Sequence, residues 1–547
     1  MSTLRYLFAA VAALCLTFGT QALADDFHVS GTVLYDDGAP AAGVAVSDGF
    51  RVAVTDSEGH YSMAVCPDSR YIFVSCPADA VISKNESGIP DFYRDYTASQ
   101  SVYDFTLKRC AKEKVFSLFA MADPQAHGMK VDGQDVLQTV RFRTESVPAV
   151  NRRIAGSTVP CYGVMLGDIV YSEDERNSTV DMPYMRESVK MIGMPVFQVM
   201  GNHDYTYCFT DCPLKEDDAH STINLQAQSA FAENFGPIDF SFNRGDAHIV
   251  CMKDIIFEDP SDATHYHGGF TTSQYMWLKA DLAAVPVEKM VILCVHIPLT
   301  DFCTKENTYG PQVVELLKQY PNVHILSGHM HYMKNITEKE SPVGIYEHIH
   351  AALCGQWWWS NLNGDGSPNG YSVYTFSGNR LSDSYYVGVN EGMDDRSYQM
   401  RLYRGNELTG GDFEKFSWNV ADNTLIANVF NADANWVLNV YEDGVLSGTM
   451  ARVPFSNVRV PYVEGQVTLA PEGSSKDWWT IGYHTGVLGW SHVMGGRYQC
   501  NGFHLYEYEL KNPLASVKVE AIDPFGNRYE CSCISSGTDY PDWIRKP

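Results

Sequence analysis

Side chains that can bind divalent metal ions or move protons follow five short apolar runs in the middle of the chain. Each run ends in a polar motif: "ADPQ", "LGDIVY", "GNHD", "VHIPL" and "GHMH". The motifs combine carboxylate, amide and imidazole groups, a donor set that suits Mn, Fe, Zn or Co better than Ca. The residues concerned are Asp123, Gln125, Asp168, Asn202, His203, Asp204, His296, His329 and His331.

These motifs require strands that deliver them to one place. Apolar runs such as "YGVMLGD" and "VFQVMGNHD" alternate with helix-like stretches such as "DMPYMRESVKMIG". This alternation is typical of a layered α/β domain, in which ligands bind outside the carboxyl ends of the strands. His329 and His331 are two residues apart, so an extended segment would present both on the same side. The glycines before Asp168, Asn202 and His329 would let the backbone turn sharply and approach a bound ion closely.

The order of the five motifs resembles that of the calcineurin-like metallophosphoesterase superfamily. Between the third and fourth motifs, "PIDFSFNRGDAHIVCMKD" and "TTSQYMWLKADL" are similar to the strand pair and helix that lie there in this family. The resemblance implies an α/β fold with a β-sandwich core flanked by helices in αββα layers. The layout of the whole chain resembles exported members with small N- and C-terminal β domains.

The resemblance also implies a dinuclear metal centre in which Asp168 bridges two divalent ions. The implied ligands are Asp123, Gln125 and His331 for one ion, and Asn202, His296 and His329 for the other. Two ions ~3.5–4 Å apart would clamp a phosphoryl oxygen and convert a bridging water to hydroxide. The family therefore implies metal-dependent hydrolysis of a phosphoester, with Mn, Fe or Zn as the expected metals.

Three further residues are implied at the catalytic site. His203 would protonate the leaving group or stabilise its charge. Asp204 would support the site or cap a helix without binding metal. Phosphoprotein phosphatases of the superfamily carry Asp and then Arg after the second motif, where this chain has Tyr171. Three interpretations of Tyr171 stay open, namely metal ligation, orientation of His203 and packing, and we favour a role in the pocket wall or in support of the ligands.

Gln125 occupies a position where imidazole is usual in this family. Its carbonyl oxygen is a neutral donor that does not titrate near neutral pH, and His127 is the alternative donor two residues on. The D-x-Q motif is similar to the variant in manganese-dependent nucleotide-diphosphate hydrolases. It favours a phosphodiesterase or pyrophosphohydrolase that acts on a small nucleotide-like or glycerol-phosphate-like molecule. The alternatives are a phosphomonoesterase, or a secreted binding protein with a degenerate site.

Composition narrows the class of partner. The chain has 547 residues, of which 45% are hydrophobic, and a formal net charge of −26. A strongly acidic protein lacks the basic footprint that binding to a nucleic-acid polymer needs. Bound metal ions would still allow it to accept a small phosphorylated substrate. The run Trp357–Trp359 could stack on a base or a sugar ring, although a packing role is the simpler interpretation.

Four segments are predicted along the chain. Residues 1–24 have the positive start, the apolar core "LFAAVAALCLTFG" and the "ALA" ending of a signal peptide, so we expect export to the periplasm or the extracellular space. Residues 26–108 resemble the small β-sandwich modules related to transthyretin and carboxypeptidase regulatory domains. Residues 113–385 hold the five motifs, and residues 386–547 are predicted to form a β-rich domain. No run is long enough to favour a membrane span.

Overall fold

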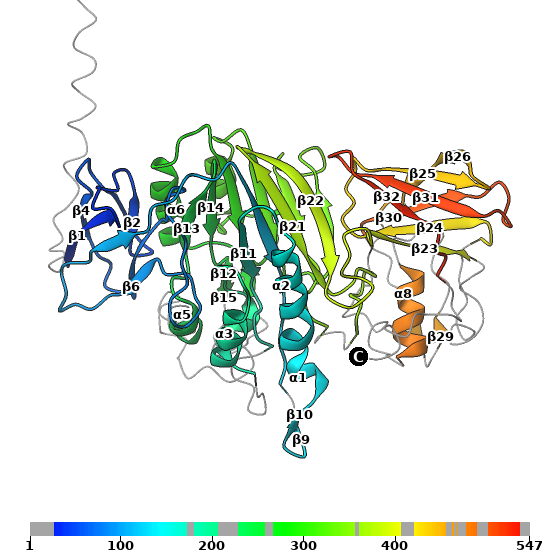
Figure 1. The fold of residues 1–547 in the computed structure, drawn as a ribbon, viewed down its shortest axis with the longest axis horizontal. Helices are drawn as coiled ribbons and strands as arrows, with labels where there is room; N and C mark the ends of the chain where they lie inside the picture. Colours follow the sequence, from blue (N-terminus) through cyan, green and yellow to red (C-terminus); the bar gives the residue numbers. More distant parts are fainter. Residues whose placement is uncertain are drawn as a thin grey trace, which may run out of the picture.

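The structure is a computed structural model in which a central domain lies between two smaller β modules (Figure 1). The predicted signal peptide and Trp357–Trp359 lie outside the residues that it describes. The described residues are 27–128, 130–171, 180–205, 228–257, 266–355, 360–405, 421–455, 462–463, 466–467, 477–488 and 502–535.

The N-terminal module consists of two small sheets. One has the strand order β4-β1-β7 and the other the order β3-β2-β5-β6. Its buried aliphatic and aromatic side chains belong to the same hydrophobic cluster as those of the central domain, so the two parts share a core. The strands are β1 (His28–Tyr35), β2 (Ala45–Ser47), β3 (Val52–Val54), β4 (His60–Ala64), β5 (Tyr71–Val74), β6 (Tyr93–Asp95) and β7 (Phe105–Leu107).

The first central sheet has five strands in the order β12-β11-β8-β21-β22. Strands β8, β11 and β12 are parallel, whereas β21 pairs antiparallel with β8 and β22 antiparallel with β21. Strand β8 is buried at every position after its first, as expected for a strand that is covered on both faces. The bounds are β8 (Val115–Met121), β11 (Cys161–Leu166), β12 (Val196–Val199), β21 (Gly370–Ser377) and β22 (Arg380–Gly388).

The second central sheet has six strands in the order β13-β14-β17-β18-β20-β19. Strands β14, β17, β18 and β20 are parallel, and the edge strands β13 and β19 are antiparallel to their neighbours. The bounds are β13 (Phe240–Arg244), β14 (Ala247–Cys251), β17 (Met290–Cys294), β18 (Val323–Ser327), β19 (Lys334–Ile336) and β20 (Tyr346–Ile349). Short hairpins are β9 (Lys130–Val131) with β10 (Gln134–Asp135), and β15 (Ile255–Phe257) with β16 (Tyr266–Gly268).

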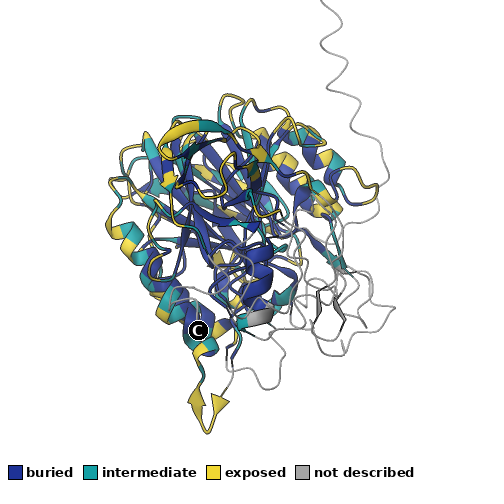
Figure 2. Cartoon of the chain, turned by 90° about the vertical axis from the view of Figure 1, so that its right-hand side faces the viewer, coloured by how far each residue is buried: buried dark blue, intermediate teal, exposed yellow. Residues whose placement is uncertain are grey.

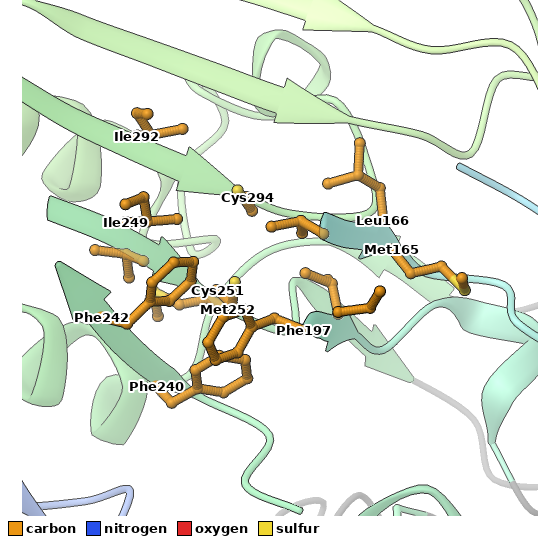
Figure 3. Packing of buried hydrophobic residues seen from close by; sticks show 14 of the residues in the cluster. Met165, Leu166, Phe197, Phe240, Phe242, Ile249, Cys251, Met252, Ile292 and Cys294 are labelled. Atoms are coloured by element: carbon orange, nitrogen blue, oxygen red, sulfur yellow. The ribbon is translucent and has the colours of Figure 1, made fainter. Parts of the chain in front are cut away.

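The two central sheets pack face to face through apolar side chains. Phe197 of β12 stacks on Phe242 of β13 with their ring centroids 3.9 Å apart. Figure 3 shows buried side chains of both sheets in this interior, among them Met165 and Leu166 of the first sheet and Ile249 and Ile292 of the second. Burial of this interior is the main favourable contribution to the stability of such a fold, at roughly 25 cal/mol per Å² of apolar surface.

Helices lie outside the paired sheets, with their outer faces exposed (Figure 2). Their starts follow capping rules: the side chain of Asp181 accepts a hydrogen bond from the backbone N–H of Tyr184, and Thr271 forms a capping box with Gln274. The helical elements are α1 (Leu137–Arg141), η1 (Phe142–Ser146), α2 (Val147–Ala155), α3 (Met182–Lys190), η2 (Asn202–Asp204), α5 (Ser229–Phe235), α6 (Thr272–Ala283), η3 (Leu299–Asp301) and α7 (Gly310–Leu317).

The C-terminal module contains two four-stranded sheets, in the orders β23-β24-β30-β27 and β26-β25-β31-β32, and a separate hydrophobic cluster. Its strands are β23 (Met400–Arg404), β24 (Thr424–Val429), β25 (Val437–Glu442), β26 (Val445–Thr449), β27 (Ala451–Arg452), β30 (Leu505–Glu509), β31 (Val517–Ile522) and β32 (Arg528–Cys531). The remaining elements are α8 (Trp478–Gly482), η6 (Tyr483–Val487), β28 (Tyr462–Val463) and β29 (Gln466–Val467).

The predicted α/β fold with a β module at each end is confirmed. Strands β21 and β22 belong to the first central sheet as far as Gly388, so the central domain and the segment that precedes the C-terminal module are continuous in structure. The exact domain boundaries stay predictions. Among the described residues, no helix has both the length and the apolar character that crossing a bilayer requires.

Candidate metal centre and active site

All five motifs follow the carboxyl ends of parallel strands. In the first sheet, β8, β11 and β12 lead into the "ADPQ", "LGDIVY" and "GNHD" motifs, and in the second sheet the neighbouring strands β17 and β18 lead into "VHIPL" and "GHMH". Because the two sheets pack against each other, these five strand ends meet at one edge of the core. The arrangement is the one expected for a ligand site in a layered α/β domain.

One cluster of donor atoms gathers around Asp168, His296 and His329. The Nε2 atom of His296 lies 3.2 Å from Asp168 Oδ1, and Nδ1 of His329 lies 3.2 Å from that same Nε2. The side-chain oxygen of Asn202 lies 3.0 Å from both imidazole nitrogens. The other ring nitrogen of His296, Nδ1, donates to the carbonyl of Leu166, which leaves Nε2 as the atom that can bind an ion.

A second cluster shares Asp168 and adds Asp123 and His331. One ligand atom from each of these three residues lies within 4.8 Å of the others. Nε2 of His331 is 3.3 Å from Asp123 Oδ1. The carboxylate of Asp123 also accepts the backbone N–H of His329 at 2.9 Å, and this bond ties the two clusters together. Asp168 therefore lies in the position that a bridging ligand would need.

Gln125 provides a direct test of whether the residues fit divalent ions. Its Nε2 donates to Asp168 Oδ2 at 2.9 Å, and its backbone N–H donates to the carbonyl of Asp168. Its side-chain oxygen is buried without a hydrogen-bond partner. A buried unpaired acceptor beside a carboxylate is costly unless something positive binds it. If the amide rotated by 180°, its oxygen would replace its nitrogen beside the Asp168 carboxylate. A cation could then bind both the amide oxygen and the carboxylate, so the residues fit a cation at this position.

The backbone of the candidate ligands is strained. Of the nine described non-glycine residues with positive φ, five are candidate ligands. Residues with larger side chains seldom adopt this conformation, which persists where the surrounding structure enforces it and is frequent at functional sites. The five are Asp123 (φ 46°), Gln125 (35°), Asp168 (51°), His329 (67°) and His331 (55°).

Two glycines leave the space that the ligands occupy. A Cβ atom at Gly201 would lie 2.2 Å from Asp168 Oδ1, and one at Gly328 would lie 2.6 Å from Asp123 Oδ2. Both positions precede a candidate ligand, as the sequence predicts. Any larger residue there would displace a carboxylate of the site.

The carboxylate and imidazole groups of the first cluster polarise one another. Burial alone would raise the pKa of Asp168, but His296 and then His203 hold it well below its usual range. Burial alone would lower the pKa of His296, and Asp168 raises it to about 10. A bound divalent cation would take the place of the proton on His296, because metal ligands bind in their deprotonated forms.

His203 lies beside the two clusters and is held by the backbone. Its Nδ1 donates to the carbonyl oxygen of Tyr171 at 2.6 Å, and its backbone N–H donates to Asp168 Oδ1 at 2.8 Å. Its Nε2 lies 4.0 Å from Asp168 Oδ2, on the side of the metal clusters. The ring centroid of Tyr171 is 5.8 Å from that of His203 and 4.6 Å from that of His127. Tyr171 thus orients His203 through its main chain.

Asp204 connects two of the motif loops. Its Oδ1 accepts the backbone N–H groups of Ile169 and Val170, and its Oδ2 accepts that of Gly201. It is completely buried; the bonds from Ile169 and Val170 hold the loop after β11 against the loop after β12, and the bond from Gly201 fixes the turn within the latter. Asp204 therefore positions ligands without being directed at the metal clusters.

His127 and Asp254 complete the surroundings of the site. His127, the alternative to Gln125, belongs to neither cluster and lies against Tyr171. Asp254 is buried, and its Oδ1 accepts the backbone N–H groups of His296 and Ile297 at 3.1 Å. Sequence reasoning missed Asp254, and the only local signal was the charged pair Lys253–Asp254 at the end of the apolar run "AHIVCM".

Three family profiles match consecutive parts of the chain. The N terminal of calcineurin-like phosphoesterase matches residues 27–110, calcineurin-like phosphoesterase itself matches residues 147–333, and the C terminal of calcineurin-like phosphoesterase matches residues 347–529. The chain therefore belongs to the calcineurin-like phosphoesterases, which makes it a phosphoester hydrolase of a family that uses divalent metals. No curated protein sequence matches it.

Several solved structures show distant likeness. A purple acid phosphatase from yellow lupin (Lupinus luteus) is 12% identical, with 64% of this chain and 67% of that chain covered and a TM-score of 0.34. PhoD is 10% identical, with 74% of this chain and 90% of that chain covered and a TM-score of 0.33. The 5'-nucleotidase from Candida albicans is 10% identical, with 52% of this chain and 54% of that chain covered and a TM-score of 0.32.

Proposed function

We propose that this chain is a phosphodiesterase or pyrophosphohydrolase with a dinuclear metal centre. Its substrate would be a small nucleotide-like or glycerol-phosphate-like molecule. The observation that carries the proposal is the pair of donor clusters that share Asp168. A single carboxylate between two sets of ligands is the arrangement that two-metal phosphoester hydrolysis requires.

The first cluster would hold one ion through Asp168, Asn202, His296 and His329. The second would hold the other through Asp123, Gln125, Asp168 and His331. When bound, the ions would supply Lewis acidity and lower the pKa of a water molecule. Oxygen and nitrogen donors without thiolate favour Mn, Fe or Zn in these positions.

His203 would protonate the leaving oxygen. Because its Nδ1–H is committed to the carbonyl of Tyr171, the proton that it can give away is on Nε2, which lies on the side of Asp168. A proton delivered from a fixed imidazole contributes about 10²–10⁴-fold to the rate of such reactions. Asp204 and the carbonyl of Tyr171 would keep the imidazole in place during turnover.

Charge supports a metal-dependent reaction. Asp123 and Asp168 are buried side by side at the centre of the site, and the whole chain has a formal net charge of −26. Without metal ions, these two carboxylates would repel a phosphate group that approached the site. Two divalent cations would reverse that field and allow an anionic substrate to bind.

Comparison of a diester with a monoester tests the proposed substrate class. The full chain, loaded with Mn²⁺, should hydrolyse bis-p-nitrophenyl phosphate with a kcat/KM at least about tenfold higher than that for p-nitrophenyl phosphate, which corresponds to about 1.4 kcal/mol of transition-state preference. Turnover of the monoester alone would instead establish a phosphomonoesterase. Hydrolysis of neither compound, with no bound metal, would favour a binding protein with a degenerate site.

Substitution of Gln125 by histidine tests the assignment of this residue as a ligand. Imidazole is a stronger donor than an amide oxygen for Mn, Fe or Zn. We expect Gln125→His to tighten the ion in the Asp123–His331 cluster by about tenfold, or ~1.4 kcal/mol. Gln125→Leu, which removes the oxygen, should weaken the same ion. Calorimetric titration with Mn²⁺ would measure both, and curves identical to those of the wild type for both variants would exclude Gln125 from the ligand set.

A further inference from the structure

The segment directly after His331 is held by the C-terminal module. The ring of Tyr332 lies against Phe503, with the ring centroids 4.7 Å apart. The ammonium of Lys334 lies 4.6 Å from the centroid of the same Phe503 ring. These contacts join residues that are about 170 positions apart in the chain, and they begin one residue after a candidate metal ligand.

Asp365 links the segment after His331 to His504, the residue that follows Phe503 in the C-terminal module. Asp365 is buried, and its Oδ2 accepts the backbone N–H of Met333 at 2.7 Å. The same oxygen lies 3.0 Å from Nε2 of His504, which is also buried. Its Oδ1 accepts the backbone N–H and the hydroxyl of Ser367. Both carboxylate oxygens are therefore occupied, and one of them connects His504 to the main chain beyond His331.

The loop that carries Asp365 is itself fixed by the C-terminal module. Asn428 donates to the carbonyl of Asp365 at 2.8 Å, and Arg401 donates to the carbonyl of Gly366 at 3.0 Å. Gly366 has φ +86°, and a Cβ atom there would lie 1.9 Å from Asp477 Oδ2. The two hydrogen bonds hold the loop against the module, and the absence of a side chain at Gly366 allows the close contact.

Leu353, which precedes Asp365 by 12 positions in the chain, is hydrogen-bonded next to Asp123. The backbone N–H of Leu353 donates to the carbonyl of Ala122 at 2.8 Å, and Ala122 pairs with Ala352 in a parallel β-bridge. Leu353 thus contacts the main chain beside Asp123, and Asp365 contacts the main chain two residues after His331. Asp123 and His331 belong to one metal cluster, whereas His296, in the other, is held by Leu166 and Asp254.

We propose that the C-terminal module positions the Asp123–His331 metal cluster, and that Asp365 and His504 are positioning residues for its ion. This inference rests on the proposed function, because it assigns a role at the same metal centre. Partners that orient ligands from behind change metal affinity by about 10–100-fold when they are removed. The effect should be larger on this ion than on the other, since two ligands of the other cluster, Asp168 and His296, follow β11 and β17.

Variants of His504 in the full chain test the inference. His504→Ala removes the donor to Asp365, whereas His504→Gln keeps an N–H group that can replace it. We expect His504→Ala to weaken one of two Mn²⁺ sites by about 10–100-fold in a calorimetric titration, and His504→Gln to retain most of the affinity. Phe503→Leu, which loses the ring contacts with Tyr332 and Lys334, should weaken the same site.

Loss of stability must be separated from loss of positioning. Asp523 provides the control, because it is also a buried carboxylate of the C-terminal module and accepts the backbone N–H groups of Phe525 and Asn527. Asp523→Asn should lower the thermal midpoint without changing either Mn²⁺ affinity. A folded His504→Ala protein with both wild-type affinities would overturn the inference and leave the proposed function intact. A wild-type protein that binds no Mn²⁺ would overturn both.

Discussion

Replacement of Asp168 by asparagine should abolish phosphodiester hydrolysis and prevent both metal ions from binding. Asp168 is the one residue that both donor clusters share, and it is buried between His296 and Gln125. Its loss removes the one carboxylate that both cations would share. We expect kcat/KM for the diester to fall by at least about 10³-fold, which exceeds the loss usual for one neutral hydrogen-bond donor in a catalytic site.

Thermal unfolding provides a second measure of the Asp168 variant. A ligand that binds only the folded state stabilises it, by about 2.7 kcal/mol when its concentration is 100 times Kd. Mn²⁺ should therefore raise the Tm of the wild-type protein and have little effect on Asp168→Asn. Asp281→Asn is the matched control, because Asp281 forms a buried pair with His248 at 2.8 Å elsewhere in the same domain. Its Tm should still rise with Mn²⁺, and an equal rise in Asp168→Asn would contradict the assignment of the bridge.

Replacement of His203 by alanine should remove most of the activity and leave the metal content unchanged. His203 contacts Asp168 through its backbone and presents Nε2 from a ring that Tyr171 fixes. Loss of a positioned general acid costs about 10²–10⁴-fold in rate. The loss should be larger for a diester with an alkyl leaving group than for one with p-nitrophenol, because the poorer leaving group depends more on protonation.

His127→Ala provides the comparison for His203. The ring of His127 lies against the ring of Tyr171, and His127 belongs to neither metal cluster. We expect its effect on the rate to be much smaller and independent of the leaving group. An unchanged rate in His203→Ala, or the same fractional loss for both leaving groups, would show that a different residue supplies the proton.

That the five motifs lie together in space could be predicted from the sequence, because the apolar runs and the order of the motifs can both be read directly from it. Each apolar run marks a strand, and the carboxyl ends of parallel strands meet at one edge. The sequence alone could not decide which of the three interpretations of Tyr171 is correct. Tyr171 acts through a main-chain carbonyl, and a carbonyl is the same in every residue, so side-chain identity carries no information about it.

Long-range support was also invisible in the sequence. Asp365 and His504 are 139 residues apart, and no spacing rule connects them. The positive φ angles of Asp123 and His331 could not be predicted either. Asp and His adopt positive φ more often than most residues, but still too rarely for residue type to locate such angles in a sequence. The sequence indicated which residues bear the chemistry, and the tertiary structure showed what holds them.

Metal content is the most direct test of the central claim that two ions share Asp168. The full chain and the Asp168→Asn variant would be loaded with Mn²⁺ and dialysed, and the bound metal would be measured by elemental analysis. The account predicts two ions per wild-type chain and almost none in Asp168→Asn. Equal metal content in the two proteins, or a wild-type chain that retains no metal, would contradict it.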